Sequence, residues 1–160
     1  MSRAAALATV AVLVVLDRVT KLWILSSMSV GETFPVIDGL FSITSVRNRG
    51  AAFGMFSSLP DAYRLALFVV VGVGATLGIG YLMLRRDSDP AERLPFAGIL
   101  GGALGNFYDR LAYGEVVDFL DVYVGEWHWP AFNVADSGIT IGAVLLVLMS
   151  LRGQSPGQSP

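Results

Sequence analysis

The chain has 160 residues, of which 54% are hydrophobic and only 15% are charged. Soluble domains carry about 25% charged residues, so this composition indicates a membrane protein, and the net charge of -2 gives no sign of a nucleic-acid partner. The absence of cysteine excludes a disulfide framework and a thiolate nucleophile, and a single histidine, His128, argues against a histidine-rich metal site or a Ser-His-Asp triad. We therefore expect one domain with no metal or other cofactor.

The first apolar stretch, residues 4–25, predicts a transmembrane helix about 33 Å long. A basic start followed by an apolar run also occurs in signal peptides, but no small-residue cleavage site follows here. Asp17 and Lys21 are four residues apart and share one helix face. We expect them to form a structural ion pair that faces other helices, rather than to take part directly in catalysis.

A long loop is expected at residues 26–62. Its apolar residues Phe41 and Ile43 alternate with Ser42 and Thr44, which is typical of a β-strand. A polar run centred on Asn48 then precedes a small, apolar run at residues 50–56. Two interpretations remain open: an ordinary surface hairpin, or a cradle over a membrane-embedded site into which Asn48 points.

Two further spans follow, at residues 65–84 and 94–112. In the first we interpret the four glycines as packing positions; these are Gly72, Gly74, Gly78 and Gly80. The second contains two overlapping small-xxx-small patterns, Gly98 with Gly102 and Gly101 with Gly105, which favour close approach of another helix. Its last turns carry three polar residues on one face: Asn106, Asp109 and Arg110.

Residues 113–131 are expected to leave the membrane, with aromatic residues and His128 at the membrane–water boundary. A fourth span, residues 132–151, carries Asn133 and Asp136 in its first turn. The single domain would therefore cover residues 1–152, followed by a polar, disordered tail at 153–160.

Four spans place both termini on one side of the membrane, together with the basic connection at residues 85–93, so we expect cytoplasmic termini. The alternation of the spans also brings the polar residues near the opposite, extracytoplasmic face, under the long loop. These residues are Asp17, Asn106, Asp109, Arg110, Asp118, Asn133 and Asp136.

Neighbouring cations separate the acids in this group. Asp17 is close to Arg18 and Lys21, and Asp109 is adjacent to Arg110, so both carboxylates should stay ionised and structural. Asp118 and Asp136 have no basic residue within four positions. Two unpaired carboxylates brought together near a low-dielectric boundary share a proton, which is the arrangement of an aspartic protease. Asp121 also lacks a local cation and remains a competitor at this point.

Five motifs occur in order along the chain: DRVTK at 17–21, NRGAAFG at 48–54, GNFYDR at 105–110, VVDF at 116–119 and FNVAD at 132–136. Together they resemble the lipoprotein signal peptidase family, also called signal peptidase II, over nearly the whole chain. Two positions depart from the family's usual pattern: Arg18, where glutamine is common, and Gly54, where serine is common.

The resemblance implies a mainly α, polytopic inner-membrane protein with four transmembrane helices and a small extracytoplasmic β-sheet. It implies an aspartyl endopeptidase that cleaves lipid-modified prolipoproteins on the amino side of a diacylglyceryl-modified cysteine, with its active site near the extracytoplasmic face. The catalytic pair falls on Asp118 and Asp136. The family's supporting polar positions fall on Asp17, Lys21, Asn48, Asn106, Asp109, Arg110 and Asn133.

We expect prolipoprotein substrates and membrane lipid as partners, and a monomeric protein. The main rival interpretation is a transport protein that uses intramembrane acids to relay protons or bind cations, which would distribute its acids across the membrane depth. A purely structural membrane subunit is a second rival, but it leaves Asp118 and Asp136 unexplained.

Overall fold

The computed structural model describes residues 1–50 and 55–153. Two predictions therefore fall outside the described residues: the glycine at position 54, and residues 154–160 of the tail. The described residues form four helices, α1 (Arg3–Ser27), α2 (Asp61–Leu84), α3 (Arg93–Tyr113) and α4 (Val134–Gly153), and four strands, β1 (Thr33–Ile37), β2 (Phe41–Asn48), β3 (Val116–Val124) and β4 (Trp127–His128). The predicted mainly α fold with a small sheet is confirmed.

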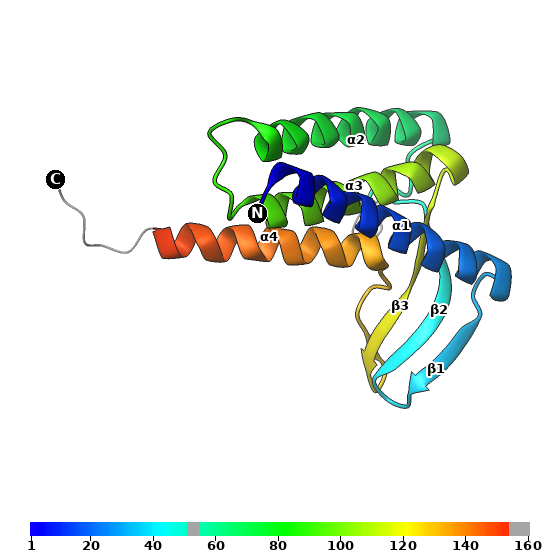
Figure 1. Cartoon of the computed structure of the whole chain (residues 1–160). Coiled ribbons are helices and arrows are strands. Elements are labelled where there is room, and N and C mark those ends of the chain that lie inside the picture. The colour runs from blue at the N-terminus through cyan, green and yellow to red at the C-terminus, as the bar shows by residue number, and fades with distance from the viewer. Residues whose placement is uncertain (51–54, 154–160) are drawn as a thin grey trace.

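The four helices lie side by side, and α3 packs against each of the other three (Figure 1). Glycines on α3 make its contact with α4 close, as their spacing predicts. A Cβ added at Gly102 would lie 2.2 Å from the carbonyl oxygen of Ala135, and one at Gly98 would lie 2.9 Å from that of Gly138. Backbone contact at these positions leaves no room for a side chain, so α4 is held directly against α3.

The glycines of α2 behave differently from each other. Gly72 packs against the ring of Phe107, whereas Gly74 and Gly78 have no neighbouring atom within 4 Å of an added Cβ. The prediction that all four are packing positions is therefore wrong for these two. Only one side of α2 faces α3, and Gly74 and Gly78 lie away from it.

The sheet is an antiparallel meander in the order β1-β2-β3-β4. It projects sideways from the ends of α1 and α3 (Figure 1). A small apolar cluster joins it to the bundle, in which Ile24 near the end of α1 packs with Val117 and Phe119 of β3. The segment expected as a loop at 113–131 therefore contains β3 and β4, and the strand predicted around Phe41 is confirmed as β2.

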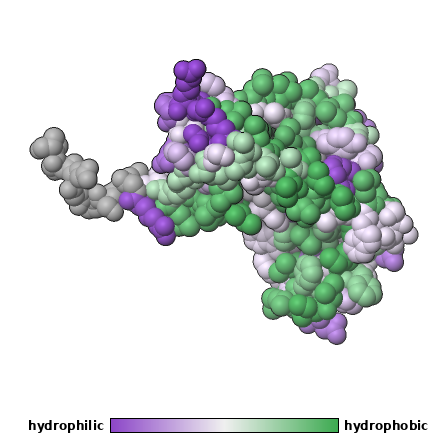
Figure 2. Space-filling view, viewed as in Figure 1, coloured by the Kyte–Doolittle hydropathy of each residue, from purple (hydrophilic) through white to green (hydrophobic). Residues whose placement is uncertain are grey.

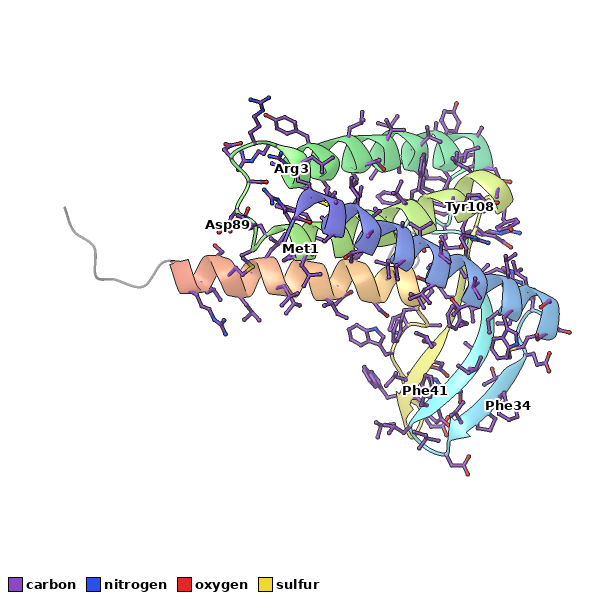
Figure 3. All side chains as sticks on the ribbon, viewed as in Figure 1. Met1, Arg3, Phe34, Phe41, Asp89 and Tyr108 are labelled. Carbon is purple, nitrogen blue, oxygen red and sulfur yellow. The ribbon has the colours of Figure 1, made fainter. Side chains whose placement is uncertain are left out.

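The N-terminus lies beside the connection between α2 and α3, at the end of the bundle away from the sheet (Figure 3). The Met1 amino group donates to the Pro90 carbonyl oxygen at 2.9 Å, and Arg3 donates to the carbonyl oxygen of Arg85 at 3.1 Å. The described end of α4 lies at the same end of the bundle. Figure 2 shows hydrophilic residues gathered there, while hydrophobic residues cover much of the adjoining helical surface.

Within the described residues, α2 and α4 are long and apolar enough to cross a membrane. The other two helices carry more charged residues in their sequences, among them Asp17 and Lys21 on α1 and Asp109 and Arg110 on α3, which lowers their apolar character. The length and apolar composition of the helices thus support two of the four predicted spans, and the count of four spans stays a prediction.

Candidate active site

The start of α4 is built by two residues that cap each other. The side-chain oxygen of Asn133 accepts from the backbone N–H of Asp136 at 2.9 Å, and the Asp136 carboxylate accepts from the backbone N–H of Asn133 at 3.3 Å. This reciprocal pairing is a capping box, with Asn133 as the N-cap. The expectation that Asn133 lies in the first turn is therefore wrong by one residue, because the helix begins at Val134.

Asp118 lies on β3 and accepts hydrogen bonds at both carboxylate oxygens. Asn133 donates to Oδ1 at 2.7 Å, and Asn48, at the end of the adjacent strand β2, donates to Oδ2 at 3.0 Å. Asn48 is itself fixed, because its own side-chain oxygen accepts from the backbone N–H of Gly50 at 3.0 Å. Of the two interpretations of the 26–62 loop, this arrangement favours the one in which Asn48 points into a site.

Asp136 lies close to Asp118, since both carboxylates contact Asn133. Its Oδ1 accepts from the side-chain amide of Asn106 on α3 at 2.7 Å. All four carboxylate oxygens of Asp118 and Asp136 thus accept a hydrogen bond from a neutral N–H group. Hydrogen bonds of this kind orient a carboxylate without supplying a compensating positive charge.

A buried ionic cluster lies behind the asparagines. The Nζ atom of Lys21 lies 2.8 Å from Asp17 and 2.9 Å from Asp109, and all three side chains are fully buried. Lys21 also donates to the side-chain oxygen of Asn106 at 2.9 Å. The predicted Asp17–Lys21 ion pair is therefore present.

The prediction that Arg110 is the cation paired with Asp109 is wrong. Asp109 pairs with Lys21 and Arg18 on α1, not with its neighbour Arg110. Successive residues of a helix point in different directions, so an adjacent cation is a poor guide to the partner in space. Arg18 also lies over the ring of Tyr108, 4.5 Å from its centroid.

Arg110 instead faces the site. Its guanidinium donates to the carbonyl oxygen of Gly50 at 3.1 Å and lies 4.4 Å from the centre of the Phe68 ring. It lines the same cavity as Asp118 and Asp136, so the absence of nearby cations along the sequence does not hold in space.

Asp121 has a different setting from Asp118, although it lies only three residues away on the same strand. Both of its oxygens contact Nδ1 of His128, at 2.9 and 3.0 Å, and the His128 ring stacks on Tyr123. Asp121 does not line the cavity that contains the other two acids. The side chain of His128 is half exposed.

A cavity of about 720 Å³ opens over Asp118 and Asp136. Its polar wall is formed by the predicted residues Asn48, Asn106 and Arg110. Its apolar wall continues along α4 and the segment before it, through Trp129, Pro130, Ala131, Phe132, Ile139 and Ile141. Sequence reasoning missed this wall, because aromatic residues at 113–131 indicate only a membrane–water boundary and the α4 residues indicate only an apolar helix.

Burial and the nearby charge of Asp136 raise the pKa of Asp118 from 3.8 to about 6. The hydrogen bonds from Asn48 and Asn133 and the charge of Lys21 oppose this shift in part. A carboxyl group in this range holds a proton more readily than an ordinary aspartate does, while a second carboxylate lies beside it.

Comparison with known proteins identifies the relatives of this chain. The family model described as signal peptidase (SPase) II matches residues 9–152. The chain belongs to the signal peptidase II family. The lipoprotein signal peptidase of Syntrophus aciditrophicus is 45% identical over 149 residues, which cover 92% of each chain. That of Burkholderia mallei is 48% identical over 141 residues, 88% of this chain and 84% of the relative.

A solved structure described as a bacterial membrane enzyme has the same fold, with a TM-score of 0.85 and 30% identity over 98% of this chain and 95% of that one. A second, also described as a bacterial membrane enzyme, has a TM-score of 0.81 and 33% identity over 92% of this chain and 93% of that chain. Membership of the signal peptidase II family makes this chain a membrane peptidase, and it does not favour the rival interpretation as a transport protein.

Proposed function

We propose that this protein is an aspartyl endopeptidase that removes signal peptides from prolipoproteins, cleaving on the amino side of a diacylglyceryl-modified cysteine. The observation that carries the proposal is the meeting of Asp118 and Asp136 in one cavity, with neutral donors on all four of their oxygens. Membership of the signal peptidase II family supports the same substrate class.

In the proposed mechanism the two carboxyl groups share one proton, carried by Asp118, whose raised pKa favours it. Asp136 takes a proton from a water molecule as the water oxygen bonds to the scissile carbonyl carbon. Asp118 gives its proton to the carbonyl oxygen, which forms a neutral tetrahedral intermediate. Collapse of this intermediate breaks the C–N bond. The proton held by Asp136 passes to the departing amine of the cysteine residue, and one hydroxyl of the intermediate returns its proton to Asp118 as the new carboxyl group forms.

The apolar wall of the cavity supports a lipid-anchored substrate. Ile139 and Ile141 lie on α4 within two turns of Asp136, and Ile141 is 61% exposed. A diacylglyceryl group dissolved in the bilayer gains about 0.8 kcal/mol for each buried methylene. The lipid also sets the depth of the adjacent peptide bond, so it supplies orientation as well as local concentration.

The proposed topology has four spans with cytoplasmic termini, and the dyad near the extracytoplasmic face. The hydrophilic end of the bundle, with Arg3, Arg85 and Arg93, supports a cytoplasmic location for that end. Reactivity of single cysteines tests this, because the chain has no cysteine of its own. The single variants Ser2→Cys and Glu126→Cys should react with membrane-impermeant reagents from opposite sides of the membrane of intact cells. Reaction of both from the same side would contradict the topology.

A side-by-side cleavage assay tests the substrate. Two precursor peptides of one sequence, with and without diacylglyceryl on the cysteine, are incorporated in the same liposomes, and membrane association of both is verified. We expect efficient cleavage of the lipidated peptide and little of the free-cysteine peptide. Equal rates would mean that the lipid is not recognised, and would leave a more general intramembrane aspartyl protease.

A further inference from the structure

Three asparagine side chains hold the proposed dyad, and each is anchored on its far side by a group that can only donate. The Asn48 oxygen accepts from Gly50 N–H, and the Asn133 oxygen accepts from Asp136 N–H. The Asn106 oxygen accepts from Lys21 Nζ at 2.9 Å. With each oxygen turned away, each NH₂ group necessarily faces a carboxylate.

Lys21 differs from the other two anchors because it is a side chain. An ammonium group has no acceptor, so it fixes which end of the Asn106 amide is oxygen. The amide nitrogen of Asn106 then faces Asp136 Oδ1 at 2.7 Å. We propose that Lys21 is a positioning residue for the dyad, an inference that rests on the proposed function. Lys21 holds the Asn106 amide in the orientation that keeps an N–H donor on Asp136.

The consequence concerns the location of the proton. If the Asn106 amide rotates by half a turn, its oxygen faces Asp136 Oδ1, and two acceptors meet. The Asn106 oxygen and Asp136 Oδ1 can then form a hydrogen bond only if Asp136 carries the proton that the dyad shares, and this leaves Asp118 ionised. The base and the acid of the proposed mechanism would then be exchanged, and the water-activating carboxylate would be blocked.

A second donor reaches Asn106, but it is shared. The Asn133 amide nitrogen lies 3.1 Å from the Asn106 oxygen, 2.7 Å from Asp118 Oδ1 and 3.3 Å from the Val117 carbonyl oxygen. Two N–H bonds serve three acceptors, and the carboxylate is the closest and the charged one. Lys21 is therefore the stronger anchor of the Asn106 oxygen.

The test is a double-mutant cycle in an Asp17→Asn parent. The parent has one buried cation in excess, and replacing Lys21 there leaves Asp109 paired with Arg18, so no buried acid loses its last cation. Lys21→Met and Asn106→Ala are added singly and together. The kcat and KM are measured on the lipidated precursor, and thermal unfolding verifies that each variant folds. If Lys21→Met does not fold, Lys21→Gln replaces it, because a glutamine amide can present either end to Asn106 and fixes neither.

We expect Lys21→Met to lower kcat by roughly 10²-fold, the low end of the contribution of a positioned acid or base, with KM little changed. In the Asn106→Ala background the same change should alter kcat by no more than about twofold, because Lys21 acts through Asn106. A Lys21 that serves folding alone would lower stability in both backgrounds and leave kcat of the folded protein unchanged.

Equal losses in kcat in both backgrounds, or no loss in either, would overturn the role of Lys21 while cleavage by the parent leaves the proposed function standing. A wild-type protein that cuts no lipidated precursor would instead overturn the proposed function, and this inference with it.

Discussion

Asp118 and Asp136 differ from the other buried acids of the bundle in what their oxygens contact. Asp17 and Asp109 contact ammonium or guanidinium groups, whereas the hydrogen-bond donors of Asp118 and Asp136 are neutral amides. A carboxylate paired with a buried cation is held in its charged form and stabilises the fold. A carboxylate held by amides can gain or lose a proton without leaving a cation unpaired, as proton transfer requires.

Asp118→Asn and Asp136→Asn should each lower cleavage by at least about 10²–10⁴-fold, because the near-isosteric amide cannot shuttle a proton. Cleavage of the lipidated precursor measures the loss, and thermal unfolding in detergent verifies the fold. Asp121→Asn is the matched control, since Asp121 is buried on the same strand but contacts His128 outside the cavity. Substantial turnover by either dyad variant would remove that residue from the mechanism.

The raised pKa of Asp118 also predicts a pH-dependent stability. Between the ordinary pKa of 3.8 and the folded value of about 6, the folded protein binds this proton more tightly than the unfolded chain does. The contribution of this proton to the stability of the fold is fully present below pH 3.8 and is lost as pH rises through about 6. The unfolding free energy of wild type relative to Asp118→Asn should thus fall by about 3 kcal/mol across this range. A difference that stays constant with pH would contradict the shift.

Asp109→Asn should act on stability. It leaves Lys21 and Arg18 with one acid in place of two, at a cost of about 3–5 kcal/mol for a broken buried pair. Asp61→Asn is the comparison: Asp61 also pairs with an arginine, Arg64, but its side chain is 86% exposed, so the change should cost about 1 kcal/mol or less. Unfolding in detergent measures both, and lost cleavage at unchanged stability would move Asp109 into the reaction.

At the scale of the elements, the helix–helix contacts were easier to predict than the sheet. The glycines of α3 report directly on close packing, because a missing side chain is visible in the sequence. The strand β3 was not predicted from its residues; only the family resemblance implied a sheet there. Its run from Val116 to Val124 contains two acids and breaks the alternation that identifies a strand. Arg18, one partner of Asp109, lies 91 residues away along the chain, and His128, the partner of Asp121, lies across a hairpin, so neighbouring residues in the sequence do not identify either one.

The contact between α3 and α4 gives a prediction of its own. Gly102→Ala would place a methyl group 2.2 Å from the Ala135 carbonyl oxygen, and should cost about 1–3 kcal/mol or more as α4 is displaced. Because Asp136 lies on the same turn of α4, cleavage should fall as well. Gly78→Ala is the control: its added methyl meets open space on α2, and alanine favours a helix by up to about 1 kcal/mol. Equal stability of the two variants would contradict the close packing.

At the scale of the whole molecule, the two ends of the bundle have different chemistry. One end gathers the N-terminus and the arginines of the α2–α3 connection (Figure 3), and the sheet lies at the other end (Figure 1). The hydrogen bonds of Asp118 and Asp136 to the asparagines join the sheet to α3 and the start of α4. The alternation of the helices predicted that the acids would meet near one end. It did not predict which of them would share a cavity, because that depends on the side-chain direction along β3 and the first turn of α4.

The apolar wall of the cavity has a consequence for how the proposed enzyme is measured. A substrate that approaches along Ile139 and Ile141 arrives from the lipid or detergent phase, so its effective concentration is its mole fraction in that phase. Adding empty micelles at fixed enzyme and substrate should therefore slow cleavage, although the bulk concentrations of both are unchanged. By the same reasoning, an inhibitor's potency would follow its partition coefficient as much as its fit. Michaelis constants and inhibition constants measured with different amounts of detergent would be comparable only after conversion to the concentration within the membrane phase.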